Sequence, residues 1–153
     1  MKQRISIKDL EPGAYQAMYK LENYLSTTSL SPSLKELIKI RVSQINGCAY
    51  CIESHAIAAL KLGESDQRLY ALSAWWESPR FTDKEKAALA LADEVTLISK
   101  GGVKDSTFQQ ASSYFTDQEL AQLIMLISTY NLWNRIAVST HMFHLETAEA
   151  RNH

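Results

Sequence analysis

Apolar side chains recur through most of the sequence at intervals of three and four residues, which is the spacing of one face of an α-helix. In the first half of the chain this pattern predicts three consecutive helices, over residues 14–25, 32–46 and 48–63. Residues that commonly start or stop helices bound these segments, namely Pro12-Gly13, Ser31-Pro32, Asn46-Gly47 and Gly63. The connections are short, so we expect neighbouring helices to pack against one another.

The second half of the chain carries two sequences that form capping boxes at helix starts, Thr82-Asp83-Lys84-Glu85 and Thr116-Asp117-Gln118-Glu119. The first box precedes an alanine-rich helix that should stop at Gly101-Gly102. The second box opens a long apolar stretch from Leu120 to Val138, which we expect to be the final helix of the core. Two shorter helices are expected, one after Ser65 and before Ser78-Pro79, and one around Phe108 to Phe115.

These elements are all helical, because no segment alternates apolar and polar residues over the length of a strand. No low-complexity linker divides the chain. We therefore predict an all-α fold, a compact multi-helix bundle, with residues 1–153 in a single domain. Cys48 and Cys51 would lie at the N-terminus of the third helix.

Composition narrows the function without identifying it. The chain has 16 Lys and Arg against 17 Asp and Glu, so it lacks the basic excess that nucleic-acid binding requires. No run of about 18 apolar residues is present, and the N-terminal segment lacks the apolar core of a secretory signal. We therefore expect no membrane association and a cytoplasmic, reducing location. In that setting a close cysteine pair is more often catalytic, redox-active or metal-binding than structural.

The candidate chemistry centres on Cys48 and Cys51, the two cysteines of the chain. A disulfide between them closes a very short loop and contributes only about 2 kcal/mol by loop-closure entropy, so stability is a poor reason for the pair. A helix N-terminus favours the thiolate, which makes reversible redox chemistry the better reason. His55, one turn after Cys51, lies on the same helical face and is placed to accept its proton. The alternative is that His55 packs between helices with its nitrogens satisfied.

A zinc site is a second interpretation of the same three residues, Cys48, Cys51 and His55. Structural zinc sites close with four ligands, and the chain has no second cysteine pair. His141 or His144 would have to supply the missing ligand through the fold. We therefore expect neither a metal nor another cofactor.

The sequence from Ile45 to His55, Ile-Asn-Gly-Cys-Ala-Tyr-Cys-Ile-Glu-Ser-His, resembles the alkyl hydroperoxidase D-like (AhpD-like) branch of the carboxymuconolactone decarboxylase superfamily. The resemblance includes Glu36 and covers most of the chain, continuing through residues 58–63, 82–85, 88–93 and 131–135. It implies an all-helical fold and self-assembly into symmetric oligomers, either trimers or hexamers. It also implies a thiol-dependent peroxidase or disulfide reductase in antioxidant defence.

The resemblance assigns roles by position. Cys51 would be the peroxidatic sulfur that becomes a sulfenic acid, and Cys48 would resolve it as a disulfide. His55 corresponds to the histidine of a proton relay, and Glu36 to the carboxylate that completes the relay. Without the family pattern, Glu36 could equally be an ordinary exposed carboxylate near Lys35 and Lys39. The implied partners are a hydroperoxide substrate and a dithiol or redox-protein reductant, for which a lipoyl-type dithiol is one possibility.

Tyr50 departs from the family pattern, because the best-characterised branch has a histidine immediately before the second cysteine. A phenol, with a pKa near 10, is a poor base at neutral pH, so the motif lacks one candidate proton carrier. The main alternative function is therefore an oligomeric redox-sensing or protein-disulfide-reducing module with little peroxidase turnover. Lactone decarboxylation, suggested by the superfamily alone, is disfavoured because a redox pair has no obvious role in it.

Several other residues receive structural interpretations. The tryptophans are interpreted as core or subunit contacts, with a hydrophobic substrate platform as the alternative: Trp75, Trp76 and Trp133. Arg135 either pairs with an acidic residue across an interface or faces solvent, and Glu53 points away from the line of Cys51 and His55. The remaining histidines have no motif context and receive no role: His141, His144 and His153.

Overall fold

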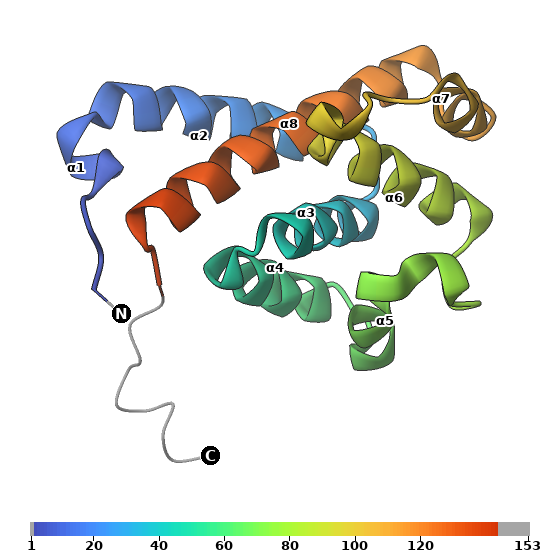
Figure 1. Ribbon diagram of the computed structural model, residues 1–153, viewed down its shortest axis with the longest axis horizontal. Coiled ribbons are helices and arrows are strands. Elements are labelled where there is room, and N and C mark those ends of the chain that lie inside the picture. The colour runs from blue at the N-terminus through green and yellow to red at the C-terminus, as the bar shows by residue number, and fades with distance from the viewer. Residues whose placement is uncertain (1, 144–153) are drawn as a thin grey trace.

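A computed structural model describes residues 2–143, which contain α-helices and short 3-10 helices and, within that range, no strand (Figure 1). The predicted all-α fold is therefore confirmed. The elements in chain order are α1 (Ile7–Leu10), α2 (Pro12–Ser26), α3 (Pro32–Asn46), α4 (Ala49–Lys61), α5 (Asp66–Ala71), η1 (Leu72–Glu77), α6 (Asp83–Thr96), η2 (Ile98–Lys100), α7 (Asp105–Ser112) and α8 (Asp117–Thr140).

The helix starts follow the sequence signals closely. The Ser31 side chain accepts a hydrogen bond from the backbone N–H of Leu34, and Pro32 occupies the first helical position of α3. Both predicted capping boxes form, with Thr82 and Glu85 bonded reciprocally at α6 and Thr116 and Glu119 at α8. These local bonds satisfy backbone N–H groups that a helix start leaves without partners.

The main differences from the sequence-based expectation are one additional short helix and one helix that ends early. The short helix α1 was not predicted; the Ser6 side chain caps it by accepting a hydrogen bond from the Asp9 N–H. The alanine-rich helix α6 ends at Thr96 rather than at Gly101-Gly102, because the backbone of Leu97 leaves the α-helical conformation and a 3-10 turn follows. A periodic apolar pattern does not distinguish an α-helix from a short 3-10 continuation.

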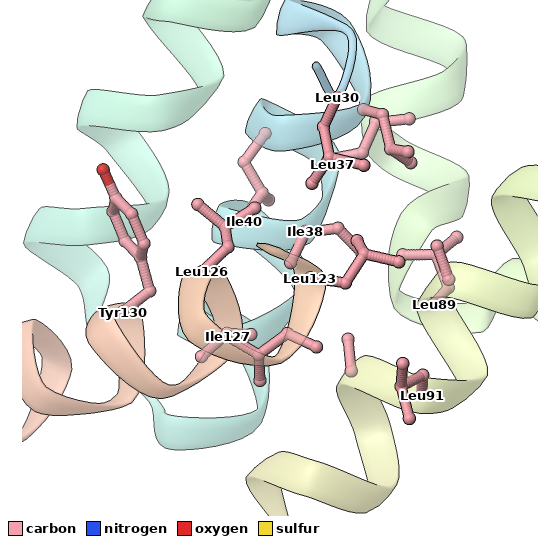
Figure 2. Close-up of a cluster of buried hydrophobic side chains, with 14 of the residues drawn as sticks. Leu30, Leu37, Ile38, Ile40, Leu89, Leu91, Leu123, Leu126, Ile127 and Tyr130 are labelled. Carbon is pink, nitrogen blue, oxygen red and sulfur yellow. The ribbon is translucent and has the colours of Figure 1, made fainter. Parts of the chain in front are cut away.

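Helix α3 lies at the centre of the fold and contacts α4, α6 and α8 (Figure 1). Its apolar side chains Leu37 and Ile38 have no exposed surface. Figure 2 shows Ile38 close to Leu89 of α6 and Leu123 of α8 in the core. Burial of each such side chain contributes roughly 1.5–3 kcal/mol, so this cluster fixes α3 relative to the helices around it.

A buried polar network joins the C-terminal half of α3 to α8. Asn46 Nδ2 donates to the side-chain oxygens of both Asn131 and Asn134, at 3.0 Å each. Asn134, which has no exposed surface, donates in turn to Ser43 Oγ at 3.0 Å. Because buried amides are costly unless bonded, this network specifies how the end of α3 sits on α8. Cys48 follows that end by two residues.

No helix within residues 2–143 combines the length and the apolar character needed to cross a membrane.

Candidate redox-active site

The turn from α3 to α4 places the cysteine pair. Gly47 ends α3 with a φ of 66°, a left-handed conformation that glycine adopts without strain. Cys48 is then the N-cap of α4, and its Sγ accepts a hydrogen bond from the Cys51 N–H at 3.3 Å. Cys51 lies in the first turn of the helix. The expected position of the pair at a helix N-terminus is confirmed.

A disulfide joins Cys48 and Cys51, whose Cα atoms are 5.3 Å apart. Both residues are buried, with 2% and 6% of their surface exposed. They pack against Ala137 of α8, with Tyr50 and Met142 partly buried around them. The pair is therefore oxidisable in place without unfolding the helix start, and it is screened from bulk solvent.

His55 and Glu36 meet across two helices, as the sequence predicted only through the family pattern. His55 Nδ1 lies 2.8 Å from Glu36 Oε2, with the carboxylate coming from α3 and the imidazole from α4. An ionised carboxylate can only accept, so Nδ1 carries the proton in this pair. The neutral ring then has an unprotonated Nε2, which is the atom available to take a proton from a neighbouring thiol.

Lys39 adds a cation to this pair. Its Nζ lies 2.6 Å from the second oxygen of Glu36, Oε1. Burial raises the pKa of the Glu36 carboxyl. The hydrogen bond from His55, together with the positive charge and the hydrogen bond of Lys39, lowers it by more, so the pKa lies below its ordinary value. Glu36 is therefore an anion at neutral pH and a lasting acceptor for His55.

A tyrosine and a second carboxylate complete the surroundings of the imidazole. The ring of Tyr130 on α8 meets the His55 ring edge to face, with centroids 4.9 Å apart. The Tyr130 hydroxyl donates to Glu22 Oε1 on α2 at 2.6 Å. Burial raises the pKa of Tyr130, and Glu22 raises it further, so the phenol remains a donor.

Cys51 and His55 open onto one cavity of about 200 Å³. Its wall is rich in aromatic side chains, including Tyr15, Tyr19 and Trp133, whose rings pack against one another at centroid distances of 5.1 to 5.5 Å. Trp133 thus lines the candidate site. Such a cavity suits a small molecule with an apolar body and one polar end.

The structure brings together Cys48, Cys51, His55 and Glu36, the four residues proposed from the sequence. Three further residues of this neighbourhood received no role from the sequence: Lys39 is bonded to Glu36, Tyr130 packs on His55, and Glu22 is bonded to Tyr130. Glu22 and Tyr130 are far from the motif in sequence and are brought to it only by packing of α2 and α8. For Lys39, the spacing of three residues from Glu36 on one helix was an available signal.

Trp75 and Trp76 lie apart from this cavity, in η1. The indole N–H of Trp75 donates to Asp93 Oδ2 at 3.2 Å, and Trp76 is 52% exposed. Of the three tryptophans, Trp133 lines the cavity, whereas Trp75 and Trp76 do not.

The other charged residues singled out in the sequence lie outside the cavity. Arg135 is exposed and donates to the backbone and side-chain oxygens of Asn131 on its own helix. Glu53 is exposed on α4. His141 ends α8 in a left-handed conformation, whereas His144 and His153 lie outside the described residues. Residues 2–143 contain no group of three or more His, Cys, Asp or Glu side chains that could hold a metal ion.

The sequence of the chain is similar to that of a known protein family. Residues 12–94 match the family model of the carboxymuconolactone decarboxylase family. The chain is 39% identical to the uncharacterized protein YdfG of Bacillus subtilis, over 91% of this chain and 95% of that protein. The family match, over residues 12–94, includes the positions of both cysteines, His55 and Glu36.

Solved structures show the same fold. A protein of unknown function from Agrobacterium tumefaciens, with a suggested role as the antioxidant defence protein AhpD, superposes with a TM-score of 0.92. It is 37% identical, over 95% of this chain and all of that one. An uncharacterized peroxidase-related protein from Silicibacter superposes with a TM-score of 0.76 at 25% identity, over 90% of this chain and 72% of that one.

Proposed function

The chain belongs to the carboxymuconolactone decarboxylase family as an AhpD-like member, and from that premise we propose that it is a thiol-dependent peroxidase of antioxidant defence. One observation carries the proposal: an imidazole fixed by an ionised carboxylate opens onto the same cavity as Cys51. This is the arrangement that activates a sulfur nucleophile near neutral pH. The suggested role of the Agrobacterium relative points in the same direction.

In the oxidative half of the cycle, the reduced protein reacts with a hydroperoxide at Cys51. His55 Nε2 takes the thiol proton, directly or through water, and the Cys51 thiolate attacks the terminal peroxide oxygen. The O–O bond breaks, the oxygen joins the sulfur as a sulfenic acid, and the alcohol leaves with the proton held by His55. Glu36 stabilises the imidazolium during this step.

Cys48 then completes the disulfide. Its thiolate attacks the Cys51 sulfur, the S–O bond breaks, and the oxygen leaves as water after taking a proton. Cys48 is suited to this step because its sulfur accepts the Cys51 N–H at the helix N-terminus, which favours the thiolate. A dithiol or a redox protein restores both thiols, and the second product is its disulfide.

We also propose that the protein works as a homo-oligomer in a reducing compartment such as the cytoplasm. Large apolar side chains are exposed on and next to α4, α5 and η1: Ile57, Leu60, Leu62, Tyr70 and Trp76. Tyr70 is 77% exposed, which is unusual for so large a ring on a monomer surface. Contact between copies would remove this surface from water.

A redox module with little peroxidase turnover is the second candidate, and Tyr50 is the observation that favours it. Tyr50, immediately before Cys51, lines the cavity but offers a phenol rather than an imidazole. In that case the cysteine pair would still cycle between dithiol and disulfide, but peroxide would react slowly.

The test is peroxide consumption by the purified protein with excess dithiothreitol. The peroxidase proposal expects catalytic turnover with hydrogen peroxide or an organic hydroperoxide, and loss of turnover in Cys51→Ser. Full activity of Cys51→Ser would overturn the assignment of the peroxidatic sulfur. Inactivity of the wild-type protein toward every hydroperoxide, with a disulfide that dithiothreitol still reduces, would favour the redox module.

A further inference from the structure

We propose that the reductant does not enter the cavity used by the peroxide, but binds as a dithiol in a second cavity and attacks the sulfur of Cys48. The inference rests on the proposed peroxidase cycle and specifies its reductive half. In this cycle, peroxide reacts with Cys51 in the first cavity, and the reductant attacks Cys48 in the second.

The two cysteines line different cavities although a bond joins them. Cys51 lines the cavity that contains His55, whereas Cys48 lines a second cavity of about 250 Å³ between the α3–α4 turn and the C-terminal end of α8. Neither cysteine lines both. Three residues line both cavities and so separate them: Tyr50, Ala137 and Met142.

The geometry of thiol–disulfide exchange explains why separate cavities beside the two sulfurs matter. The attacking thiolate approaches along the axis of the S–S bond, from the side opposite the sulfur that leaves. An attack on Cys48 therefore comes from the side away from Cys51, and an attack on Cys51 comes from the side away from Cys48. A separate cavity beside each cysteine offers a separate approach to each sulfur.

Charge favours the second cavity for a thiolate. The first cavity includes the carboxylate of Glu22 in its wall, and the ionised Glu36 lies directly behind His55. Among the described residues, the lining of the second cavity includes no Asp, Glu, Lys or Arg. An incoming anion is therefore not repelled there, and the ring of His141 in this lining offers a hydrogen bond to a thiol.

The leaving group does not decide between the two sulfurs. Attack on Cys48 expels Cys51, which shares its cavity with His55. Attack on Cys51 would expel Cys48, whose sulfur accepts the N–H of Cys51 at the helix start. Each leaving sulfur has a polar group beside it, so the charge of the cavity next to each sulfur determines the site of attack.

The reductive step transfers two electrons from the dithiol to the cysteine pair. One thiolate of the dithiol bonds to Cys48 Sγ, the Cys48–Cys51 bond breaks, and Cys51 leaves as a thiolate. The second thiolate of the reductant attacks its own sulfur in the mixed disulfide and expels Cys48 as a thiolate. The dithiol is oxidised by two electrons to a disulfide, and the cysteine pair is reduced by two electrons.

The direct test maps the first bond that forms. The full-length protein is oxidised with diamide, so the result does not depend on peroxidase activity, and is mixed briefly with one equivalent of 2-mercaptoethanol. Acid quenching, alkylation and tryptic digestion place both cysteines on the peptide of residues 42–61, where Ala49 and Tyr50 separate them in fragment spectra. We expect the adduct on Cys48 and the alkyl group on Cys51. The adduct predominantly on Cys51 would overturn the proposal.

A steric test uses Val138→Trp, because Val138 lines the second cavity, is 44% exposed and does not line the first. Reduction of the disulfide by dithiothreitol should slow at least about tenfold, while oxidation of the reduced protein by peroxide changes less than about twofold. Ser139→Trp, the exposed neighbour outside this cavity, is the matched control and should leave both rates unchanged. Unslowed reduction in a Val138→Trp protein that keeps its helical spectrum would contradict the proposal.

The two tests separate this inference from the peroxidase proposal. If peroxide fails to oxidise Cys51, the proposed function is wrong, but the diamide-oxidised protein still reports which sulfur the thiol attacks. If peroxide oxidises Cys51 normally and the adduct maps to Cys51, the function stands and the separate entry of the reductant is wrong.

Discussion

The carboxylate of Glu36 accepts hydrogen bonds from two side chains at once. One oxygen accepts from His55 Nδ1 at 2.8 Å and the other from Lys39 Nζ at 2.6 Å. The first contact sets the tautomer and the direction of the imidazole, and the two contacts together keep the carboxylate ionised. Glu36 is thus a positioning residue in the proposed reaction, since it acts on the sulfur only through His55.

Glu36→Gln should therefore slow the oxidation of Cys51 without unfolding the protein. An amide can present its NH2 group to Nδ1 and favour the wrong tautomer, and it no longer stabilises the imidazolium. We expect the second-order rate constant with hydrogen peroxide to fall by at least about tenfold, as measured by stopped-flow tryptophan fluorescence. Glu53→Gln, the same change on the exposed face of α4, is the control and should have little effect. Equal rates in the two variants would exclude this role for Glu36.

The lowered pKa of Glu36 also predicts how stability depends on pH. A group whose pKa is lower in the folded state stabilises the fold above its unfolded value, here 4.5, and loses that contribution as the pH falls through the folded value. The free energy of unfolding of the wild-type protein, relative to Glu36→Gln, should therefore decrease between pH 7 and the acid end of the titration. Urea denaturation at several pH values measures this difference. A pH-independent difference would show that the pKa of Glu36 is not lowered.

Single residues of the site were predictable to different degrees. The pairing of Cys51 with His55 follows from helical spacing, because both lie on one face one turn apart. Glu36 lies on another helix, so only the family pattern connected it to His55. Glu22 and Tyr130 had no local signal, since no rule of spacing says that α2 and α8 meet beside α4.

At the scale of elements, the end of α3 determines where the cysteine pair lies. Asn134 of α8 holds this end through Asn46 and Ser43, and it is fully buried. Helix α3 itself was predictable from its cap, proline and terminal glycine. Its contact with α8 was not, because asparagines in an apolar stretch give no indication of which partner satisfies them.

Asn134→Ala should destabilise the protein strongly. The substitution removes one hydrogen-bond partner from Asn46 and one from Ser43 in the protein interior, and it opens a small void. We expect the free energy of unfolding to decrease by about 2–3 kcal/mol, measured by urea denaturation. Ser139→Ala, an exposed change one and a half turns along the same helix, should stay within about 0.5 kcal/mol of wild type. Similar losses in both variants would mean that the network contributes no specific stability.

In the whole molecule, the described helices bury one large apolar cluster and a smaller one around Cys48, Cys51 and Ala137, but leave large apolar side chains exposed on and next to α4, α5 and η1. The all-α class and the number of long helices were predictable from periodicity and caps. The identity of these exposed side chains was not, because the apolar residues of α4 that face solvent, such as Ile57 and Leu60, follow the same pattern as core residues.

If the protein self-associates through these exposed apolar side chains, a charge placed among them should weaken the association. Ile57→Lys should reduce the molar mass measured by light scattering coupled to size-exclusion chromatography, because a lysine cannot be buried there without a partner. Lys61→Ala, which removes a charge from the exposed end of the same helix, serves as the control. A monomeric wild-type protein, or an unchanged molar mass in Ile57→Lys, would contradict self-association through these side chains.

The proposed peroxidase cycle depends on Cys51 being the sulfur that peroxide oxidises. The most direct measurement is dimedone labelling of the reduced Cys48→Ser protein after one equivalent of hydrogen peroxide, followed by mass spectrometry of the peptide that contains residue 51. The account predicts a sulfenic acid trapped at Cys51, and no label at Cys48 in the reduced Cys51→Ser protein under the same conditions. Labelling of Cys48 in Cys51→Ser, with none at Cys51 in Cys48→Ser, would contradict it.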